Sequence, residues 1–394
     1  MRIAIITGEY PPLEGGVGDF TRELGQNLAK QGHELHILTT LATENQEKVA
    51  DGMTIHREIK NWGWTAYSQI TAWLHKYDPD IINIQYQIAA YQLQASITLY
   101  PRWQGRHLRA PIVTTFHDLL PPYLFPKAGT LRQWAVRQLA QYSAGVIVTN
   151  GKDYTALSDF LGEDPQPLIR LIHIGSNISP QPPEGYSRQH WRRAHQIPPD
   201  ALLLGFFGFL NQSKGIEYLL EALQLLHTQY HLPAHLVFIG GRTGDSDITN
   251  STYAAQIDAL VAEYGLEAHI HRTGYTRPEE VSAALLATDI CPLPYREGVN
   301  LRRGTLHACL AHGRAIVTTQ PPVKIEQLPA EKVVLLVPPA DGAALAAAIQ
   351  RLHQDSALRA TLEKNAAVLA AEFSWKRIAA QTSELFRNVI AEKD

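Results

Sequence analysis

Short apolar runs alternate with longer helical patterns along this chain, and the alternation stops once near the middle before it resumes. The first cycle consists of an apolar run at residues 2–7 (RIAIIT), a helical pattern at 17–31 and a second run at 34–39 (ELHILT). This alternation is typical of βαβ units, in which helices connect parallel strands. The runs are almost continuously apolar, as expected for strands that are covered by helices on both faces. The sequence therefore predicts an α/β fold.

The break in the alternation predicts two domains. Prolines and a glycine interrupt the pattern at residues 178–185 (ISPQPPEG), and 394 residues exceed what one core usually contains. We expect an N-terminal domain at 1–183, a C-terminal domain at 184–373, and a helix at 374–394 that could cross back to the first domain. Two doubly wound, Rossmann-like domains would then face a central cleft. In open α/β sheets, ligands bind beyond the carboxyl ends of the strands.

Composition excludes several classes of protein. The formal net charge of −3 provides no general attraction for nucleic acid or for an acidic membrane, so any anion must be bound locally. Cys291 and Cys309 lie in apolar segments, which suggests buried free thiols in a reducing compartment. The first apolar run is too short for a signal peptide, and no run approaches the roughly 18 residues of a spanning helix. We expect a cytoplasmic protein, at most peripheral to the inner face of the membrane.

Two candidate sites follow strands of the first domain. Gly15 and Gly16 open a helix directly after the first strand, where glycines allow a close approach and unpaired amides favour an anion. The same glycines could simply form a flexible turn, and the spacing is not the GxGxxG of dinucleotide sites. His117 follows the strand IVTTF and could hydrogen-bond a substrate hydroxyl. With 17 histidines in the chain, a packing role for it is the alternative.

Two further candidates follow strands of the second domain. Lys214 lies in GFLNQSKG, before a helix, and could bind phosphate or could be an ordinary loop lysine, since the Walker pattern is absent. Glu297 and Gly298 precede a helix that we expect to begin near Leu301, with backbone amides of 300–303 available to an anion. This loop also carries the adjacent pair Arg302 and Arg303.

Taken in order, these four segments resemble the retaining nucleotide-sugar glycosyltransferases of the GT-B fold, in particular glycosyltransferase family 4. The resemblance extends over EYPPLEGGVGDF, FHD, GFLNQSKGIEYLLEAL, EGVNL and AHGRAIVTT. It implies transfer of a hexosyl group from a nucleoside-diphosphate sugar with retention of configuration. The implied reaction requires no metal or other cofactor. The implied site comprises Gly15, Gly16 and Lys214 at the diphosphate, His117 and Glu297 at the sugar, amides of Gly298, Val299, Asn300 and Leu301, and Tyr275 at the nucleobase.

The chain departs from the family pattern at two positions. Phe209 stands where the family usually has an arginine of the phosphate loop, and Thr305 stands where it usually has a second glutamate that binds the ribose. A hydroxyl lacks the charge-assisted hydrogen bonds of a carboxylate. Arg302 or Arg303 could replace the lost cation, but not both, because adjacent helical residues point about 100° apart.

Other functions fit parts of the sequence. Asp245 and Asp247 in GDSD resemble a metal-binding pair of another transferase fold, although such a sequence is more often a turn. A nucleotide-sugar epimerase and a nucleotide-binding protein with a degenerate donor site are the remaining alternatives. The acceptor could be a polysaccharide, a lipid-linked molecule or a small molecule. Basic and aromatic residues mix at 99–109 and 123–140, which would suit contact with a membrane or an ordinary solvated surface.

Overall fold

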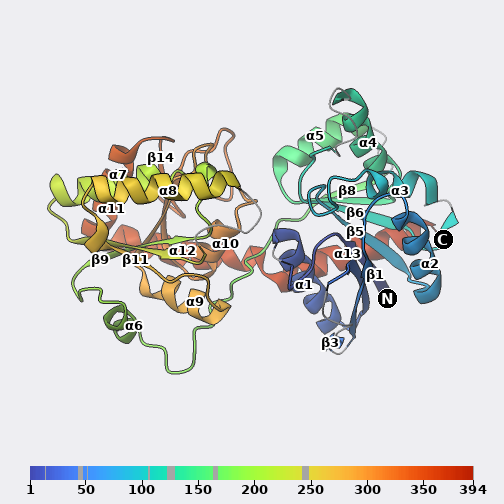
Figure 1. Cartoon of the computed structure of the whole chain (residues 1–394), viewed down its shortest axis with the longest axis horizontal. Coiled ribbons are helices and arrows are strands. Elements are labelled where there is room, and N and C mark those ends of the chain that lie inside the picture. The colour runs from blue at the N-terminus through green and yellow to red at the C-terminus, as the bar shows by residue number, and fades with distance from the viewer. Residues whose placement is uncertain are drawn as a thin grey trace. The chain divides into compact units, whose positions relative to one another are not determined.

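The structure is a computed structural model that describes residues 1–13, 15–42, 48–50, 52–104, 107–121, 129–162, 167–241 and 248–393. The chain forms two compact units. The first consists of Met1–Gly175 together with Ser374–Asp394, and the second of Ser176–Phe373. Each unit has its own sheet (Figure 1), with two clusters of buried apolar residues in the first unit and one in the second.

The first unit contains an eight-stranded sheet in the order β3-β4-β2-β1-β5-β6-β7-β8, parallel except for the β3–β4 pair. The strands are β1 Arg2–Thr7, β2 Glu34–Thr40, β3 Lys48–Ala50, β4 Met53–Ile59, β5 Ile81–Tyr86, β6 Ile112–Phe116, β7 Gly145–Val148 and β8 Leu168–Leu171. The helices are α1 Gly16–Lys30, α2 Ala66–Tyr77, α3 Ser96–Gln104, α4 Gly129–Gln141, α5 Gly151–Leu161 and α13 Trp375–Lys393. One core contains residues of α1 and α13, and another contains residues of α2 to α5, so the sheet is covered on both faces.

Helix α13 ends the chain yet belongs to the first unit. Ile378 and Phe386 lie in the core that contains residues of α1. Ser383 Oγ lies 2.9 Å from Nε2 of His33, and Lys393 Nζ donates to the carbonyl of Arg109 at 2.8 Å. The first unit is therefore assembled from both ends of the chain.

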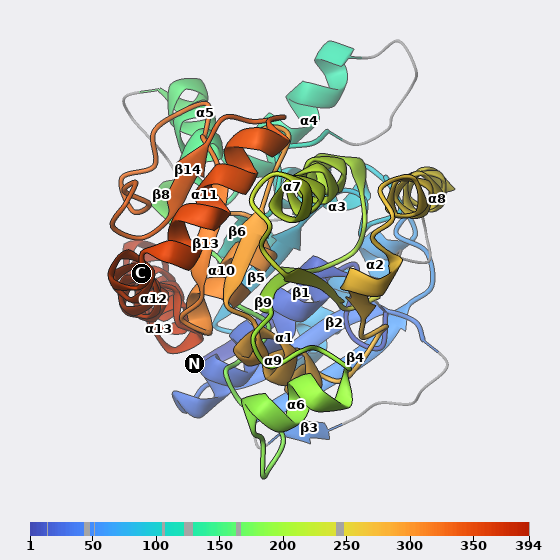
Figure 2. The ribbon, with the colours of Figure 1, turned by 90° about the vertical axis from the view of Figure 1, so that its left-hand side faces the viewer.

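The second unit contains a six-stranded parallel sheet in the order β11-β10-β9-β12-β13-β14. The strands are β9 Leu202–Phe207, β10 Ala234–Ile239, β11 Ile270–Arg272, β12 Ile290–Leu293, β13 Ala315–Thr319 and β14 Leu335–Val337. The helices are α6 Arg188–Ala194, α7 Ile216–Thr228, α8 Ile248–Glu263, α9 Pro278–Ala287, α10 Gly304–Ala311, α11 Gly342–Gln354 and α12 Ser356–Ala370, with short 3-10 turns at Gln212–Lys214, Glu267–His269 and Ala371–Phe373. Figures 1 and 2 show α7 and α11 on one face of the sheet and α9 on the other.

The boundary between the units lies earlier in the chain than residue 183, where the prolines had suggested it. Ile178 is buried in the core of the second unit, and the hydroxyl of Ser176 donates to its carbonyl at 2.7 Å. The proline-rich segment therefore begins the second unit, because its one large apolar side chain packs there.

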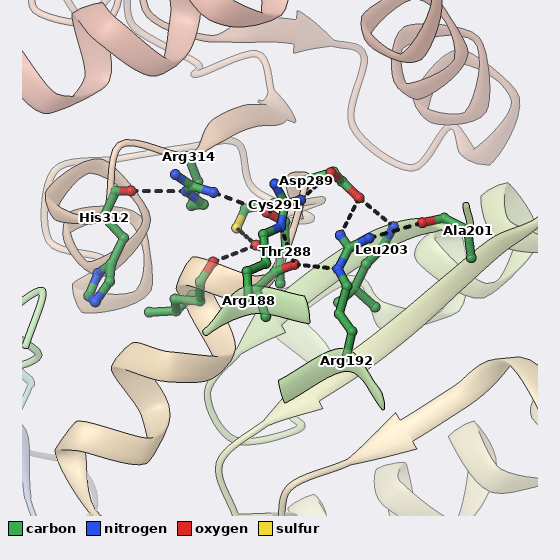
Figure 3. Close-up of polar contacts among 11 residues, drawn as sticks. Arg188, Arg192, Ala201, Leu203, Thr288, Asp289, Cys291, His312 and Arg314 are labelled. Carbon is green, nitrogen blue, oxygen red and sulfur yellow. Dashed lines mark hydrogen bonds and ion pairs between the residues drawn. The ribbon is translucent and has the colours of Figure 1, made fainter. Parts of the chain in front are cut away.

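Helix α6 is attached to the second sheet by a partly buried cluster of charges (Figure 3). Asp289, between α9 and β12, accepts from Arg192 Nη2 at 2.6 Å and from the backbone N–H of Leu203 at 2.8 Å, and it also pairs with Arg188. Burial alone would raise the pKa of Asp289, but the Leu203 hydrogen bond and the two arginines outweigh it and lower the pKa. The same arginine, Arg192, also donates to the carbonyl of Ala287 at 3.0 Å.

Two sequence expectations need correction. The strands β3 and β4 were not predicted, because the segment Met53–Ile59 includes His56 and Arg57 and does not form a continuous apolar run. Helix α10 begins at Gly304, with Arg303 as its N-terminal capping residue, rather than near Leu301. Leu301 and Arg302 form a turn, and Arg303 has an extended backbone with a ψ of 101°, which a continuous helix does not permit.

Candidate active site

The start of α1 is occupied by a carboxylate of the protein itself. Oε1 of Glu9 accepts hydrogen bonds from the backbone N–H groups of Val17 at 2.9 Å and Gly18 at 3.2 Å. The sequence had suggested unpaired amides here, and that expectation is wrong for these two groups. A Cβ on Gly15 would lie 2.1 Å from Oε1 of Glu9, whereas a Cβ on Gly16 would meet nothing within 4 Å. The glycine at 15 therefore makes room for the carboxylate, and Gly16 is the position open to a ligand.

His117 lies just beyond the carboxyl end of β6. Its backbone N–H donates to the carbonyl of Tyr86, and its Nε2 lies 2.8 Å from Oε1 of Gln85 on β5. The ring of Phe20, on α1, stands edge-on to the imidazole with the ring centres 4.7 Å apart. Burial lowers the pKa of His117 to about 3, so the imidazole is neutral at physiological pH. The structure thus brings His117 close to the helix that begins at Gly16.

In the second unit, two cations lie against one buried ring. The ring of Tyr295 is fully buried, with Nζ of Lys214 at 5.6 Å and the guanidinium carbon of Arg303 at 4.8 Å from its centre. Nη1 of Arg303 donates to Oγ of Ser213 at 3.1 Å, and that hydroxyl donates to Asn211. Burial and the charge of Arg303 lower the pKa of Lys214 to about 8. Within the described ranges, neither cation forms an ion pair with a carboxylate.

Thr305 contacts the same tyrosine. It lies in the first turn of α10, is buried, and shares a hydrogen bond with the hydroxyl of Tyr295. A Cβ on Gly208 would lie 2.9 Å from Cγ2 of Thr305 and 3.8 Å from Nζ of Lys214, and Gly208 has a φ of 117°. Lys214, which is distant in sequence from Arg303 and Thr305, therefore meets these two residues at Tyr295. If the Thr305 hydroxyl contacts a ribose, it must do so in addition to its hydrogen bond with Tyr295.

The loop that follows β12 contributes fewer amides than the sequence suggested. The N–H of Gly298 donates to Tyr295, and that of Val299 donates to Thr319. In the part of the chain that the structure describes, the amides of Asn300 and Leu301 have no protein acceptor. A Cβ on Gly298 would lie 2.3 Å from the carbonyl oxygen of Gln320, so this close approach needs glycine.

The charged residues of this loop point in different directions. Glu297 is exposed, and its carboxylate has no ion-pair or hydrogen-bond partner among residues that the structure describes. Arg302 is exposed and its N–H donates to Oδ1 of Asn300, whereas Arg303 is half-buried at Tyr295. The two adjacent arginines therefore have different surroundings, as expected for side chains that leave the backbone in different directions.

Tyr275 lies beside a second aromatic residue. Its side chain is 77% exposed, and that of Phe209 is 39% exposed. A Cβ on Gly241 would lie 2.9 Å from the ring of Phe209 and 3.8 Å from the ring of Tyr275. Phe209 was considered only as the site of a missing arginine, but the structure places it with Tyr275 at the carboxyl ends of β9 to β11.

Several contacts of the site were not foreseen. Gln85, Ser213 and Tyr295 each hold a predicted residue, yet none follows a recognisable motif. Among the described residues, no group of three or more His, Cys, Asp or Glu side chains could hold a metal ion. Asp245 and Asp247 lie outside the described residues, so the metal-binding alternative is untested. Cys291 and Cys309 are buried free cysteines.

Comparisons with known proteins agree on one class. A model described as Glycosyltransferase Family 4 matches residues 14–179, and one described as Glycosyl transferases group 1 matches 201–355. D-inositol 3-phosphate glycosyltransferases are similar to this chain: that of Corynebacterium urealyticum is 25% identical over 99% of this chain and 96% of its own, and that of Corynebacterium jeikeium is 28% identical over 99% and 97%.

Solved structures share the fold over the full length. Sucrose-phosphate synthase from Thermosynechococcus elongatus has a TM-score of 0.78 and 23% identity, with 100% of each chain covered. The Anabaena protein HepE, in complex with UDP, has a TM-score of 0.73 and 17% identity, with 98% of this chain and 100% of HepE covered. The two parallel-sheet units thus have the GT-B fold. With the two matched models, which together span most of the sequence, the chain is a glycosyltransferase that has a family 4 domain in its N-terminal part and a group 1 domain in its C-terminal part.

Proposed function

We propose that this glycosyltransferase takes its sugar from a nucleoside-diphosphate sugar, transfers it to an acceptor hydroxyl with retention of anomeric configuration, and needs no metal ion. In such a transfer, the bond between the anomeric carbon and the diphosphate oxygen breaks, and a bond from that carbon to the acceptor oxygen forms. The acceptor proton leaves with the diphosphate. The negative charge that develops on the leaving group is the charge that the protein must stabilise.

The observation that carries this proposal is the pair of cations at Tyr295. Lys214 and Arg303 both approach its ring, and the charge of Arg303 contributes to the lowered pKa of Lys214, so the two like charges interact. Two close cations without a carboxylate between them repel each other, and an anion between them would relieve that repulsion. A diphosphate has the charge and the oxygen acceptors to do so, and a guanidinium can donate to two of them.

The remaining predicted residues are assigned around that centre. The amides of Asn300 and Leu301 would donate to the diphosphate, Glu297 would accept from sugar hydroxyls, and Tyr275 with Phe209 would contact the flat face of the nucleobase. HepE, solved in complexes with UDP and with UDP-glucose, supports a nucleotide-sugar donor. Gly16 and His117 are proposed to contact the diphosphate and the sugar, respectively.

Calorimetric titration with UDP and other nucleoside diphosphates in excess chelator tests the donor. Binding should occur without divalent ions and should weaken strongly in the Lys214→Ala, Arg303→Ala double variant. Binding that is lost in chelator and restored by magnesium or manganese would instead favour the alternative of Asp245 and Asp247. The anomeric configuration of the product, read from its NMR couplings, tests retention.

Product analysis separates the two other candidate functions. An epimerase would convert the nucleotide sugar without an added acceptor, and a degenerate binding protein would bind nucleotide without turnover. Neither candidate has a structural observation of its own in its favour.

The acceptor could bring the protein to a membrane, and one surface supports this idea. Trp64, Trp103 and Trp134 are at least one-third exposed, and the Trp64 and Trp103 rings lie 5.4 Å apart, while Arg102 lies over the Trp134 ring. Exposed tryptophan beside arginine suits the interfacial region of a bilayer. None of the helices in the described ranges is both long and apolar enough to cross a membrane. Sedimentation with anionic and zwitterionic vesicles, using Trp64→Ser with Trp103→Ser, tests this peripheral contact.

A further inference from the structure

Beneath His117, a line of buried polar side chains runs through the middle of the first sheet. Asn83 and Gln85 alternate with apolar residues along β5, so both lie on one face, and both are fully buried. The register pairs Asn83 with Val113 and Gln85 with Thr115 on the neighbouring strand β6. Buried amides in a parallel sheet cost free energy unless each polar atom has a partner, so the partners of this line are informative.

The hydrogen bonds of the line begin at a backbone carbonyl. Nδ2 of Asn83 lies 3.1 Å from the carbonyl oxygen of Val113, and 3.0 Å from Oγ1 of Thr115. A carbonyl oxygen can only accept, so the amino group of Asn83 must face Val113. The carbonyl oxygen of the Asn83 side chain must then face the other way, toward Gln85.

The direction is passed along the line to His117. Oδ1 of Asn83 only accepts, so the group of Gln85 that contacts it must be the amino group, Nε2. Oε1 of Gln85 is then the atom that lies 2.8 Å from Nε2 of His117. Because that oxygen also only accepts, Nε2 of His117 must carry a proton.

The imidazole of His117 is neutral near physiological pH. Burial lowers the pKa of the imidazole to about 3, so it carries a single proton near neutral pH. That proton is on Nε2, and Nδ1 therefore has an unshared electron pair. Among the residues that the structure describes, Nδ1 has no hydrogen-bond partner. This nitrogen is also not fully buried.

We propose that Gln85 and Asn83 are positioning residues, which hold His117 in its Nε2–H tautomer so that Nδ1 accepts a hydrogen bond from a hydroxyl of the transferred sugar. This inference rests on the proposed role of His117 in the transfer. The ring nitrogen that binds the substrate is decided by the hydrogen bond of the other nitrogen. An imidazole with so low a pKa is a poor general base at neutral pH, so His117 orients the sugar and does not remove a proton from it.

Nitrogen-15 NMR of histidine-labelled protein tests the tautomer directly, with His117→Gln used to assign the signal. The wild-type protein, without donor, should show His117 as a single Nε2–H tautomer between pH 6 and 8. A His117 that is Nδ1–H, charged, or a mixture of tautomers would overturn the proposal without any variant or activity measurement.

Two variants then separate positioning from a general effect on the fold. Gln85→Leu removes the acceptor of His117, so we expect mixed tautomers and a turnover number roughly ten- to a hundredfold lower, with the dissociation constant for UDP unchanged. Thr115→Val is the matched control, because it removes a buried hydrogen bond of the same line but leaves the Val113 carbonyl to orient Asn83. It should keep the tautomer and the turnover number of wild type.

The outcomes distinguish this inference from the proposed function. If Gln85→Leu keeps a single Nε2–H tautomer, or if its turnover falls no more than that of Thr115→Val, Gln85 does not position His117. If no nucleotide sugar is turned over by the wild-type protein, the proposed function fails, and a tautomer other than Nε2–H would still refute the hydrogen-bond line by itself.

Discussion

The guanidinium of Arg303 lies over the ring of Tyr295, 4.8 Å from its centre, and donates to the hydroxyl of Ser213. Its neighbour Arg302 is exposed, and the backbone N–H of Arg302 donates to Oδ1 of Asn300. The position of Arg303 beside Lys214 makes it the better candidate to replace the cation that is missing at Phe209. The same geometry predicts which of two adjacent and chemically identical side chains affects donor binding.

Arg303→Ala should weaken the binding of UDP by about 1.5 to 3 kcal/mol, the usual range for a hydrogen bond to a charged group. Arg302→Ala is the matched control and should change the binding free energy much less. Uridine, which has no phosphate, should bind both variants like wild type. Calorimetry with the two ligands decides this, and an equal loss for UDP and uridine would contradict a role at the diphosphate.

The affinity for UDP should depend on pH through Lys214. Burial and Arg303 lower its pKa to about 8, so the ammonium that we propose to bind the diphosphate is lost as the pH rises through that value. The association constant should therefore be highest near pH 7 and fall by up to about tenfold per pH unit above pH 8. In Lys214→Arg, whose charge persists, the fall between pH 7 and 9 should disappear. A wild-type profile that is flat over this range would argue against contact between Lys214 and the diphosphate.

Asp289→Asn should destabilise the protein by about 3 kcal/mol, because it leaves Arg192 without its partner in a largely buried site. The folded-state pKa of Asp289 is lowered, so its contribution to stability is present above the pKa of about 3.9 of an unfolded Asp and is lost as the pH falls through the folded value. The difference in denaturant midpoint between wild type and variant should thus shrink below about pH 4. Glu331→Gln, at the exposed pair with Arg351, should have no measurable effect. Equal effects of the two substitutions would show that burial of the ion pair is unimportant.

His117→Ala should lower turnover and also lower stability by about 1 to 3 kcal/mol, because Oε1 of the fully buried Gln85 loses its donor. In a Gln85→Leu background, the same substitution should cost less, and the difference between the two backgrounds measures the coupling. Additive losses in unfolding experiments would mean that the two side chains do not share a hydrogen bond.

The sequence by itself was sufficient for the fold class and for most strands. The runs at 2–7 and 112–116 match β1 and β6 residue for residue, because strands covered on both faces are rich in apolar and β-branched residues. Strand β4 was not predicted because His56 and Arg57 interrupt its apolar run. Both side chains form hydrogen bonds with residues outside β4. For example, Nε2 of His56 lies 3.1 Å from Nδ1 of His36, which is on the neighbouring strand β2.

The candidate residues were chosen from sequence because ligand-binding groups gather where parallel strands end. Which of them meet was decided by tertiary structure. Thr305 and Lys214 are 3.8 Å or less from the same added Cβ at Gly208, although they belong to different loops. Whether an amide is open to a ligand also depends on residues elsewhere in the chain, as Glu9 shows at the start of α1. The tautomer of His117 likewise follows from a carbonyl on β6, reached through two side chains of β5, and no local pattern encodes such a sequence of contacts.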